Sequence, residues 1–179
     1  MRTAALFLDN NDMINSFGEQ AGIRFDYEKY VKLLEDNFDL KKRNIYITQG
    51  KNNVDRFSDF VRTLGFDSFI RPARYYRVGS QTVYHPVWQV GLTLDVVQML
   101  AEGGVDAIVL GVSNPAYVPL VDYIASAGVK VYVTAAKYHI AFDGKANLVD
   151  MGEYISSCDL KDGTPRVEEP VVQTTPLTK

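Results

Sequence analysis

The sequence predicts an α/β fold, a three-layer α/β/α sandwich with a mostly parallel central sheet. Short apolar runs, typical of strands buried on both faces, alternate with segments of helical periodicity. The clearest unit spans residues 105–135, where strand, loop, helix and strand follow without interruption. Such a unit implies two parallel strands joined by a right-handed crossover. Ligands of parallel sheets gather at the carboxyl ends of the strands, so we expect function in the loop at residues 111–116.

Glycine, proline and capping residues divide the rest of the chain. Asp26 is a predicted N-cap, Asn114 and Pro115 predict the start of another helix, and Gly79-Ser80 predicts the turn of a β-hairpin over residues 74–84. The predicted strands cover residues 3–8, 44–49, 66–72, 107–110 and 129–134. The predicted helices cover residues 27–37, 54–64, 91 or 93 to 102, and 117–124, with a short helix from residue 13 and a basic turn at residues 41–43.

The pattern weakens towards the C-terminus. Residues 146–157 predict a short strand and a final helix. From residue 159 the sequence turns to Thr, Pro, Glu and Val without a period, a composition typical of segments that form no core of their own. We therefore expect one domain over residues 1–158, and a flexible tail or partner-binding arm over residues 159–179.

Composition excludes several classes of protein. The chain has 179 residues, a hydrophobic share of 46%, a charged share of 23% and a net charge of −3, so nucleic-acid binding would need a local basic patch. The single Cys158 excludes an internal disulfide and a multi-cysteine metal site. No stretch approaches membrane-spanning length and the N-terminal apolar run is too short for a signal peptide, so a cytoplasmic location is expected.

Carboxylates stand where the first predicted strand ends. Asp9 follows this strand directly, and Asp12 lies three residues later. Asp9 therefore lies at the carboxyl edge of the sheet, where it is expected to cap the turn that follows. Asn11 stands where a haloacid-dehalogenase-type motif needs its second acid, and the loop at 111–116 lacks the glycines and lysine of a phosphate-binding P-loop.

Cations and aromatic residues alternate around the predicted hairpin. This pattern suits single-stranded RNA, through phosphate contacts and base stacking. The candidate nucleic-acid-binding residues are Arg71, Arg74, Tyr76, Arg77 and Trp88. The alternative is an exposed hairpin whose arginines are solvated and whose aromatics pack on the core or on a second subunit.

Three segments resemble the NYN domains, LabA-like members of the PIN-like nuclease fold. Residues 4–17, AALFLDNNDMINSF, are similar to the family's first strand and its Asp-Gly-x-Asn turn. Residues 90–100, VGLTLDVVQML, are similar to a helix that opens with Val-Asp-Val. Residues 106–133 are similar to the strand, the Ser-Gly-Asp-Ser-Asp-Phe loop, the Val-Pro-Leu-Val helix and the next strand. The resemblance places a NYN domain within residues 1–158.

This resemblance implies a ribonuclease or RNA-binding domain whose carboxylates hold Mg²⁺ or Mn²⁺. By position, the implied catalytic residues are Asp9 and Asp95, and the implied metal ligands are Asp9, Asp12 and Asn114. Three acidic positions of the family are neutral here, where Gln89, Asn114 and Ala116 stand. Mg²⁺ relies on carboxylates or phosphates, so a metal would be weakly bound and hydrolysis impaired.

We therefore expect an RNA-binding or regulatory protein on a ribonuclease scaffold whose acidic site is largely lost, a pseudoenzyme. One alternative is an active Mg²⁺- or Mn²⁺-dependent ribonuclease that uses Asp9, Asp12 and Asp95. Another is a scaffold protein that forms homo-oligomers through the hairpin or the C-terminal tail.

Overall fold

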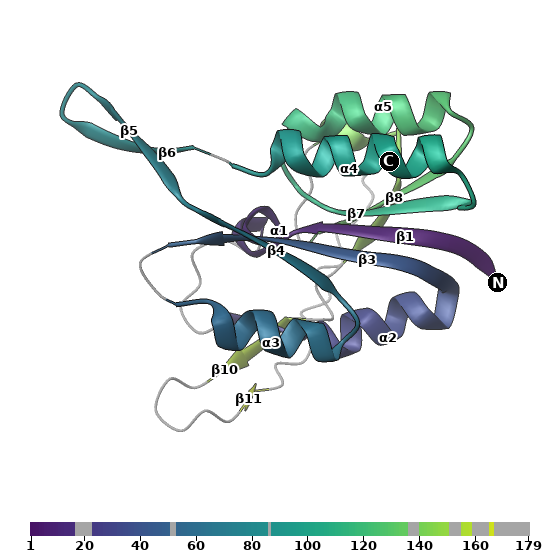
Figure 1. The fold of residues 1–179 in the computed structure, drawn as a ribbon, viewed down its shortest axis with the longest axis horizontal. Helices are drawn as coiled ribbons and strands as arrows, with labels where there is room; N and C mark the ends of the chain where they lie inside the picture. The colour runs from purple at the N-terminus through teal and green to yellow at the C-terminus, as the bar shows by residue number, and fades with distance from the viewer. Residues whose placement is uncertain are drawn as a thin grey trace, which may run out of the picture.

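Six parallel strands form the centre of the molecule (Figure 1). The computed structural model describes residues 1–16, 23–50, 53–85, 87–135, 140–150, 155–158 and 165–166. The strands lie in the order β4-β3-β1-β7-β8-β9. Their bounds are β1 Arg2–Asp9, β3 Phe38–Gln49, β4 Asp67–Pro72, β7 Ala107–Gly111, β8 Lys130–Ala135 and β9 Asn147–Asp150.

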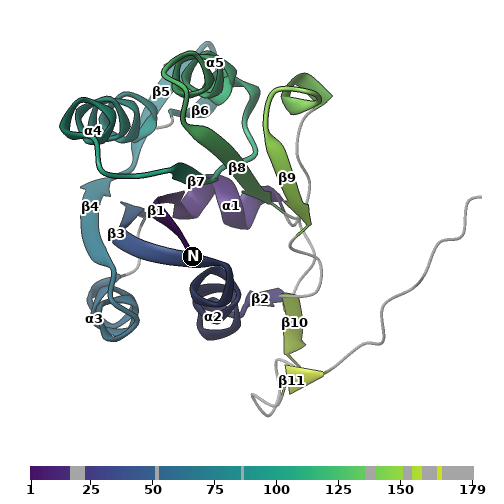
Figure 2. The same ribbon diagram turned by 90° about the vertical axis from the view of Figure 1, so that its right-hand side faces the viewer.

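Helices cover both faces of this sheet, which confirms the predicted three-layer α/β/α architecture. Figure 2 shows α2 (Tyr27–Asn37) and α3 (Asp55–Thr63) on one face, and α4 (Gln89–Glu102) and α5 (Val118–Ser126) on the other. The short helix α1 (Asn10–Ser16) follows β1 directly. Single 3₁₀ turns lie at η1 (Pro115–Tyr117) and η2 (Ile140–Phe142). No helix in the described ranges is long and apolar enough to span a membrane.

The strand order places a topological switch point between β1 and β7. The chain runs from β1 outward to β3 and β4, then crosses the sheet to β7, β8 and β9. At such a point the connections of two neighbouring strands leave towards opposite faces, and a crevice opens beyond their carboxyl ends. Asp9 ends β1 and the loop at 112–114 follows β7, so both lie at this crevice.

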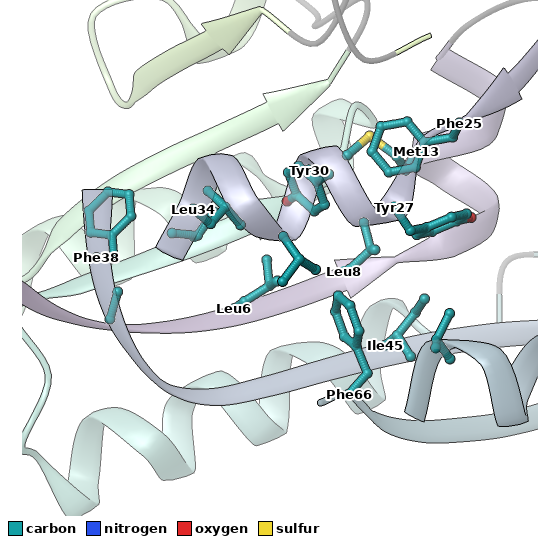
Figure 3. Packing of buried hydrophobic residues seen from close by; sticks show 14 of the residues in the cluster. Leu6, Leu8, Met13, Phe25, Tyr27, Tyr30, Leu34, Phe38, Ile45 and Phe66 are labelled. Atoms are coloured by element: carbon teal, nitrogen blue, oxygen red, sulfur yellow. The ribbon is translucent and has the colours of Figure 1, made fainter. Parts of the chain in front are cut away.

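Each face of the sheet has its own apolar core. Leu6 and Leu8 pack towards α2 and α3 with Tyr30, Leu34 and other buried residues (Figure 3), whereas Ala5 and Phe7 pack towards α4 and α5. This division follows from the alternation of side chains along β1, which is buried on both faces. Each fully buried large apolar side chain contributes roughly 1.5–3 kcal/mol.

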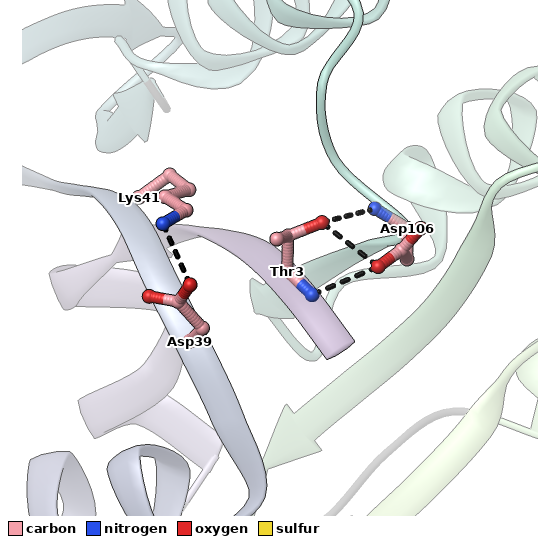
Figure 4. Close-up of polar contacts among 4 residues, drawn as sticks. All are labelled: Thr3, Asp39, Lys41 and Asp106. Carbon is pink, nitrogen blue, oxygen red and sulfur yellow. Dashed lines mark hydrogen bonds and ion pairs between the residues drawn. The ribbon is translucent and has the colours of Figure 1, made fainter. Parts of the chain in front are cut away.

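Polar contacts fix the amino end of β1 to the turn before β7. Asp106 Oδ2 accepts hydrogen bonds from the backbone N–H and the hydroxyl of Thr3, at 2.9 and 2.8 Å (Figure 4). These two bonds hold the pKa of the Asp106 carboxyl below its usual range. Asp39 and Lys41 form an exposed ion pair on neighbouring β3. The register of the central strands is thus fixed at the end opposite the switch point.

Several predicted elements are confirmed to the residue or nearly so. Helix α2 covers Tyr27–Asn37, and the Asp26 carboxylate accepts from the Lys29 N–H at 3.0 Å as its N-cap. Asn114 caps η1 by accepting from Ala116, with Pro115 at the first position. Helix α4 begins at Gln89, earlier than predicted.

The predicted basic turn at residues 41–43 is wrong, because these residues belong to β3. Lys42 pairs with Ala5 and Arg43 with Leu6 in the parallel ladder with β1. The Arg43 guanidinium also donates to Glu35 at 2.6 Å and to the Leu64 carbonyl at 2.9 Å. Pairing with a buried central strand outweighs the local preference of charged residues for a turn.

The predicted final helix is also wrong where the structure describes it. Residues Ile155–Cys158 form strand β10, which pairs with β2 (Ile23–Phe25) and with the two-residue β11 (Pro165–Arg166). Residues 151–154 lie outside the described part of the chain. So does the predicted tail at 159–179, apart from β11, and its role as a tail or arm stays a prediction.

Gly111 offers a test of packing at the end of β7. A Cβ atom at this position would lie 2.2 Å from Leu8 Cδ1 and 3.4 Å from the Leu8 backbone. Because Leu8 is fully buried, we expect Gly111→Ala to lower the free energy of unfolding by about 1–3 kcal/mol, measured by urea titration. Gly50→Ala is the control, since a Cβ there meets nothing within 4 Å. Equal stability of the two variants would contradict the close packing.

Candidate functional site

A small polar cavity of about 160 Å³ opens at the switch point. It lies beyond the ends of β1, β3 and β7, and the first turns of α1 and α4 contribute to its wall. Its lining residues are Asp9, Asn11, Asp12, Asn15, Thr48, Val87, Gln89, Asn114 and Tyr117. The structure therefore brings together Asp9, Asp12 and Asn114, which the sequence analysis named as metal ligands.

Asp9 is buried and bound by two donors from the protein. Its side chain is 6% exposed, Oδ2 accepts from the Tyr117 hydroxyl at 2.7 Å, and Oδ1 accepts from the Asp12 N–H at 3.2 Å. The second contact is that of an N-cap for α1, so the capping alternative is realised. Burial raises the pKa of the Asp9 carboxyl to about 6, although the Tyr117 and Asp12 bonds act in the opposite direction.

The Asp12 carboxylate ties α1 to the loop after β7. Oδ2 accepts from the N–H groups of Ser113 and Asn114, at 2.6 and 2.9 Å, and Oδ1 accepts from the Ser113 hydroxyl at 3.0 Å. Three donors thus occupy both carboxylate oxygens. Asp12 acts here as a link between two segments about a hundred residues apart in the chain.

Asp95 lies apart from the cavity lining. Its Oδ2 accepts from the Tyr46 hydroxyl at 2.6 Å, and that hydroxyl accepts in turn from the Asn44 amide at 3.1 Å. Burial and the neighbouring Asp95 raise the pKa of Tyr46 above its ordinary value, so this phenol stays protonated. Asp95 therefore orients the buried Tyr46 and contributes no side chain to the wall around Asp9.

The side chains of this site do not fit a divalent cation, because the cavity lining supplies two carboxylates, those of Asp9 and Asp12. Mg²⁺ and Mn²⁺ need several oxygen ligands, of which carboxylates are the strongest. The carboxylate oxygens of Asp9 and Asp12 and the amide oxygen of Asn114 already accept hydrogen bonds within the protein. Within the described ranges, no group of three or more His, Cys, Asp or Glu side chains is placed to hold a metal.

The second candidate site is the hairpin of β5 (Arg74–Val78) and β6 (Gln81–His85), which projects away from the sheet in Figure 1. It turns at Gly79, whose φ of +64° suits a tight hairpin turn, as predicted. Side chains alternate between its faces, so Arg74 and Tyr76 share one face and Tyr75 and Arg77 the other. All four are exposed.

Trp88 and Arg71 form the base of this hairpin. Trp88 is only 5% exposed, its indole N–H donates to the Ile47 carbonyl at 3.0 Å, and the Arg71 guanidinium lies 4.1 Å from the ring centre. The prediction that Trp88 stacks on a nucleic-acid base is therefore wrong, because the ring is packed in the core. Arg71 is exposed but is held by this contact and by a bond to the Val87 carbonyl.

Three further residues of this cavity were not predicted as site residues from the sequence: Tyr117, Asn11 and Thr48. Tyr117 places its hydroxyl on Asp9, and Asn11 Oδ1 accepts from the Thr48 N–H at 2.9 Å across the cavity. Burial raises the pKa of Tyr117, so its hydroxyl remains a donor. The available signal was position alone, since Thr48 lies near the end of a predicted strand and Tyr117 directly after the loop at 111–116.

Comparison with known proteins agrees with this geometry. The NYN domain family matches residues 3–152, most of the chain. A protein of unknown function from Vibrio parahaemolyticus has a similar fold, with a TM-score of 0.72 and 21% sequence identity over 86% of this chain and 96% of that chain. No curated protein matches. The match spans β1, the cavity and the parallel sheet, and the chain belongs to the NYN domain family.

Proposed function

We propose that this protein binds single-stranded RNA on a NYN scaffold that no longer carries out metal-dependent hydrolysis. One observation supports the loss of metal-dependent hydrolysis. The carboxylate oxygens that would ligate a metal at the end of β1 are hydrogen-bonded to the protein itself, through the Tyr117 hydroxyl and the backbone N–H groups of Asp12, Ser113 and Asn114. NYN domains belong to a PIN-like nuclease family, which supports RNA as the class of ligand.

The neutral residues at the cavity support the loss of hydrolysis. Gln89 and Asn114 line the cavity at positions where the family resemblance implies aspartates. An amide carries no charge, and hydrolysis of a phosphodiester needs a base or a metal-activated water. Asp9 is the carboxylate at this cavity whose pKa burial raises, and its Oδ2 accepts a hydrogen bond from the Tyr117 hydroxyl.

The hairpin supports RNA binding. Arg74 and Arg77 are exposed, and within the described ranges neither forms an ion pair with a carboxylate. Tyr75 and Tyr76 are 58% and 51% exposed. Arginines that contact phosphates and aromatic rings that stack on bases are the two components of sequence-tolerant single-strand binding. The net charge of −3 makes this local patch the element on which such binding depends.

A paired substitution on one face of the hairpin tests the proposal. We expect Arg74→Ala with Tyr76→Ala to weaken binding of a labelled single-stranded RNA by at least about tenfold, because stacking alone is worth about 1–3 kcal/mol per base. Fluorescence anisotropy at moderate salt in EDTA measures it. Arg62→Ala with Tyr123→Ala is the matched control, since it removes the same residue types from α3 and α5.

Two other outcomes separate the remaining candidates. If the wild-type protein binds no labelled RNA at moderate salt, the proposal of RNA binding is contradicted. Asp9 and Asp12 do line one cavity, which favours the ribonuclease alternative, and RNA cleavage in Mn²⁺ that disappears in Asp9→Ala would establish it. The exposed Val78 and Val83 favour assembly through the hairpin, which light scattering at high concentration would detect as a dimer or larger species.

A further inference from the structure

Two of the amide groups at the cavity, those of Asn11 and Asn114, have fixed orientations. Asn11 Oδ1 accepts from the Thr48 N–H, and Asn114 Oδ1 accepts from the Ala116 N–H, each at 2.9 Å. A backbone N–H can only donate, so these contacts identify which end of each amide is the oxygen. The polar group that each side chain retains for a ligand is its NH₂. The cavity therefore carries two fixed hydrogen-bond donors, one from α1 and one from the loop after β7.

This arrangement selects against charged ligands of both signs. A metal cation would meet NH₂ groups in place of the amide oxygens it needs. A phosphate or carboxylate would lie next to the carboxylates of Asp9 and Asp12, and repulsion between like charges opposes its entry. The ligand that fits is neutral and carries at least two hydrogen-bond acceptors.

The volume of the cavity restricts the size of the ligand. A cavity of about 150 Å³ holds one benzene molecule, so about 160 Å³ admits a single six-membered ring. Among the bases of RNA, uracil and cytosine have one ring, whereas adenine and guanine have two. The pairing edge of uracil presents acceptor, donor and acceptor (O2, N3–H and O4), whereas that of cytosine presents acceptor, acceptor and donor (O2, N3 and the N4 amine). Uracil is therefore the single-ring base that offers two acceptors on either side of a donor.

Gln89 supplies the group that uracil still requires. The N3–H of uracil lies between its two carbonyls and needs an acceptor. Gln89 lines the same cavity from the first turn of α4, and in the described part of the chain no side-chain hydrogen bond holds its amide. Its amide can therefore rotate to present the oxygen.

We propose that the former metal cavity binds a uracil base of single-stranded RNA. The base's carbonyl oxygens accept from the NH₂ groups of Asn11 and Asn114, and its N3–H donates to Gln89. This inference rests on the proposed RNA binding and adds base preference to it. The hairpin supplies affinity without regard to sequence, and the cavity reads one base.

The test replaces the NH₂ donor of Asn114 by an acceptor and keeps the hydrogen bond from the Ala116 N–H. In Asn114→Asp, the carboxylate still accepts from the Ala116 N–H, since Asp and Asn cap equally well, but the NH₂ becomes an acceptor. We expect wild-type protein to bind oligouridylate about tenfold more tightly than oligocytidylate, the value of one hydrogen bond. Asn114→Asp should bind the two equally, and Asn53→Asp, the same change in an exposed loop, should keep the preference.

The ratio of the two affinities is the readout, because an added negative charge weakens both RNAs alike. Equal wild-type affinities for oligouridylate and oligocytidylate, both reduced in the hairpin variant, would overturn the cavity assignment and leave RNA binding intact. If neither RNA binds, the proposed function fails. The cavity is then tested alone with free uridine: a shift of the Asn114 side-chain NH₂ resonances, absent with cytidine, supports the assignment, and no shift overturns it.

Discussion

Gln89→Asp combined with Asn114→Asp is expected to create a divalent cation site at the end of β1. Both residues line the cavity beside Asp9 and Asp12, so the double variant brings four carboxylates together. A unit charge about 4 Å from another contributes about 4 kcal/mol at an effective dielectric constant of 20. Mn²⁺ carries two charges, which doubles this attraction to about 8 kcal/mol per carboxylate. If about a sixth of it remains after dehydration, the two new carboxylates raise Mn²⁺ affinity about a hundredfold, or about 2.7 kcal/mol.

Calorimetric titration with Mn²⁺ measures this gain. The matched control is Gln98→Asp with Asn53→Asp, which adds the same two charges away from the cavity, on α4 and in the loop before α3. No gain over this control would mean that Tyr117 and the Ser113–Asn114 N–H groups hold the existing carboxylates too firmly to be recruited. Such a result would contradict the interpretation of the cavity as a neutralised metal site.

Asp9→Asn is expected to stabilise the protein above about pH 6. The folded-state pKa of Asp9 is about 6 against an ordinary 3.8, so between these values the folded protein binds more protons than the unfolded chain. Stability from this residue therefore falls as pH rises from about 4 to about 6. The shift of about two units corresponds to a penalty of up to about 3 kcal/mol at neutral pH.

The asparagine variant has no charge to bury, so it should avoid this penalty. Urea unfolding at several pH values measures the difference between the two proteins. We expect it to be small near pH 4 and to grow to about 3 kcal/mol in favour of Asp9→Asn by pH 7. Asp106→Asn serves as the control, because the pKa of that exposed carboxyl is lowered instead. A difference independent of pH would show that burial does not raise the Asp9 pKa.

Elements with local signals were predictable from the sequence. Helix α2 has its N-cap, its apolar face and its end within eleven residues, and its bounds were predicted correctly. The hairpin was predicted from its Gly-Ser turn. The strand at residues 41–43 was not predicted from the sequence. It depends on the pairing of Lys42 and Arg43 with β1, which lies some forty residues away in the chain.

The position of the candidate site could be predicted from the sequence, but the hydrogen bonds of its side chains could not. Strand ends placed Asp9 and Asn114 at one edge of a parallel sheet, where the structure has them. Whether their oxygens are free depends on contacts between distant segments, such as Tyr117 with Asp9 and Asp12 with Ser113. The prediction that Trp88 binds nucleic acid was wrong for the same reason, because the burial of this ring depends on contacts with β3 and with Arg71 of β4.

The contact between Arg71 and Trp88 joins the base of the hairpin to the wall of the cavity. Arg71 precedes the first leg of the hairpin and Trp88 follows the second, so one cation–π contact closes its base. Gln89, on the wall of the cavity, is the next residue after Trp88. An RNA that contacts both the hairpin and the cavity is therefore bound at two points whose separation the protein sets. Its affinity should rise in a step once the strand is long enough to span them, as for any pair of linked sites.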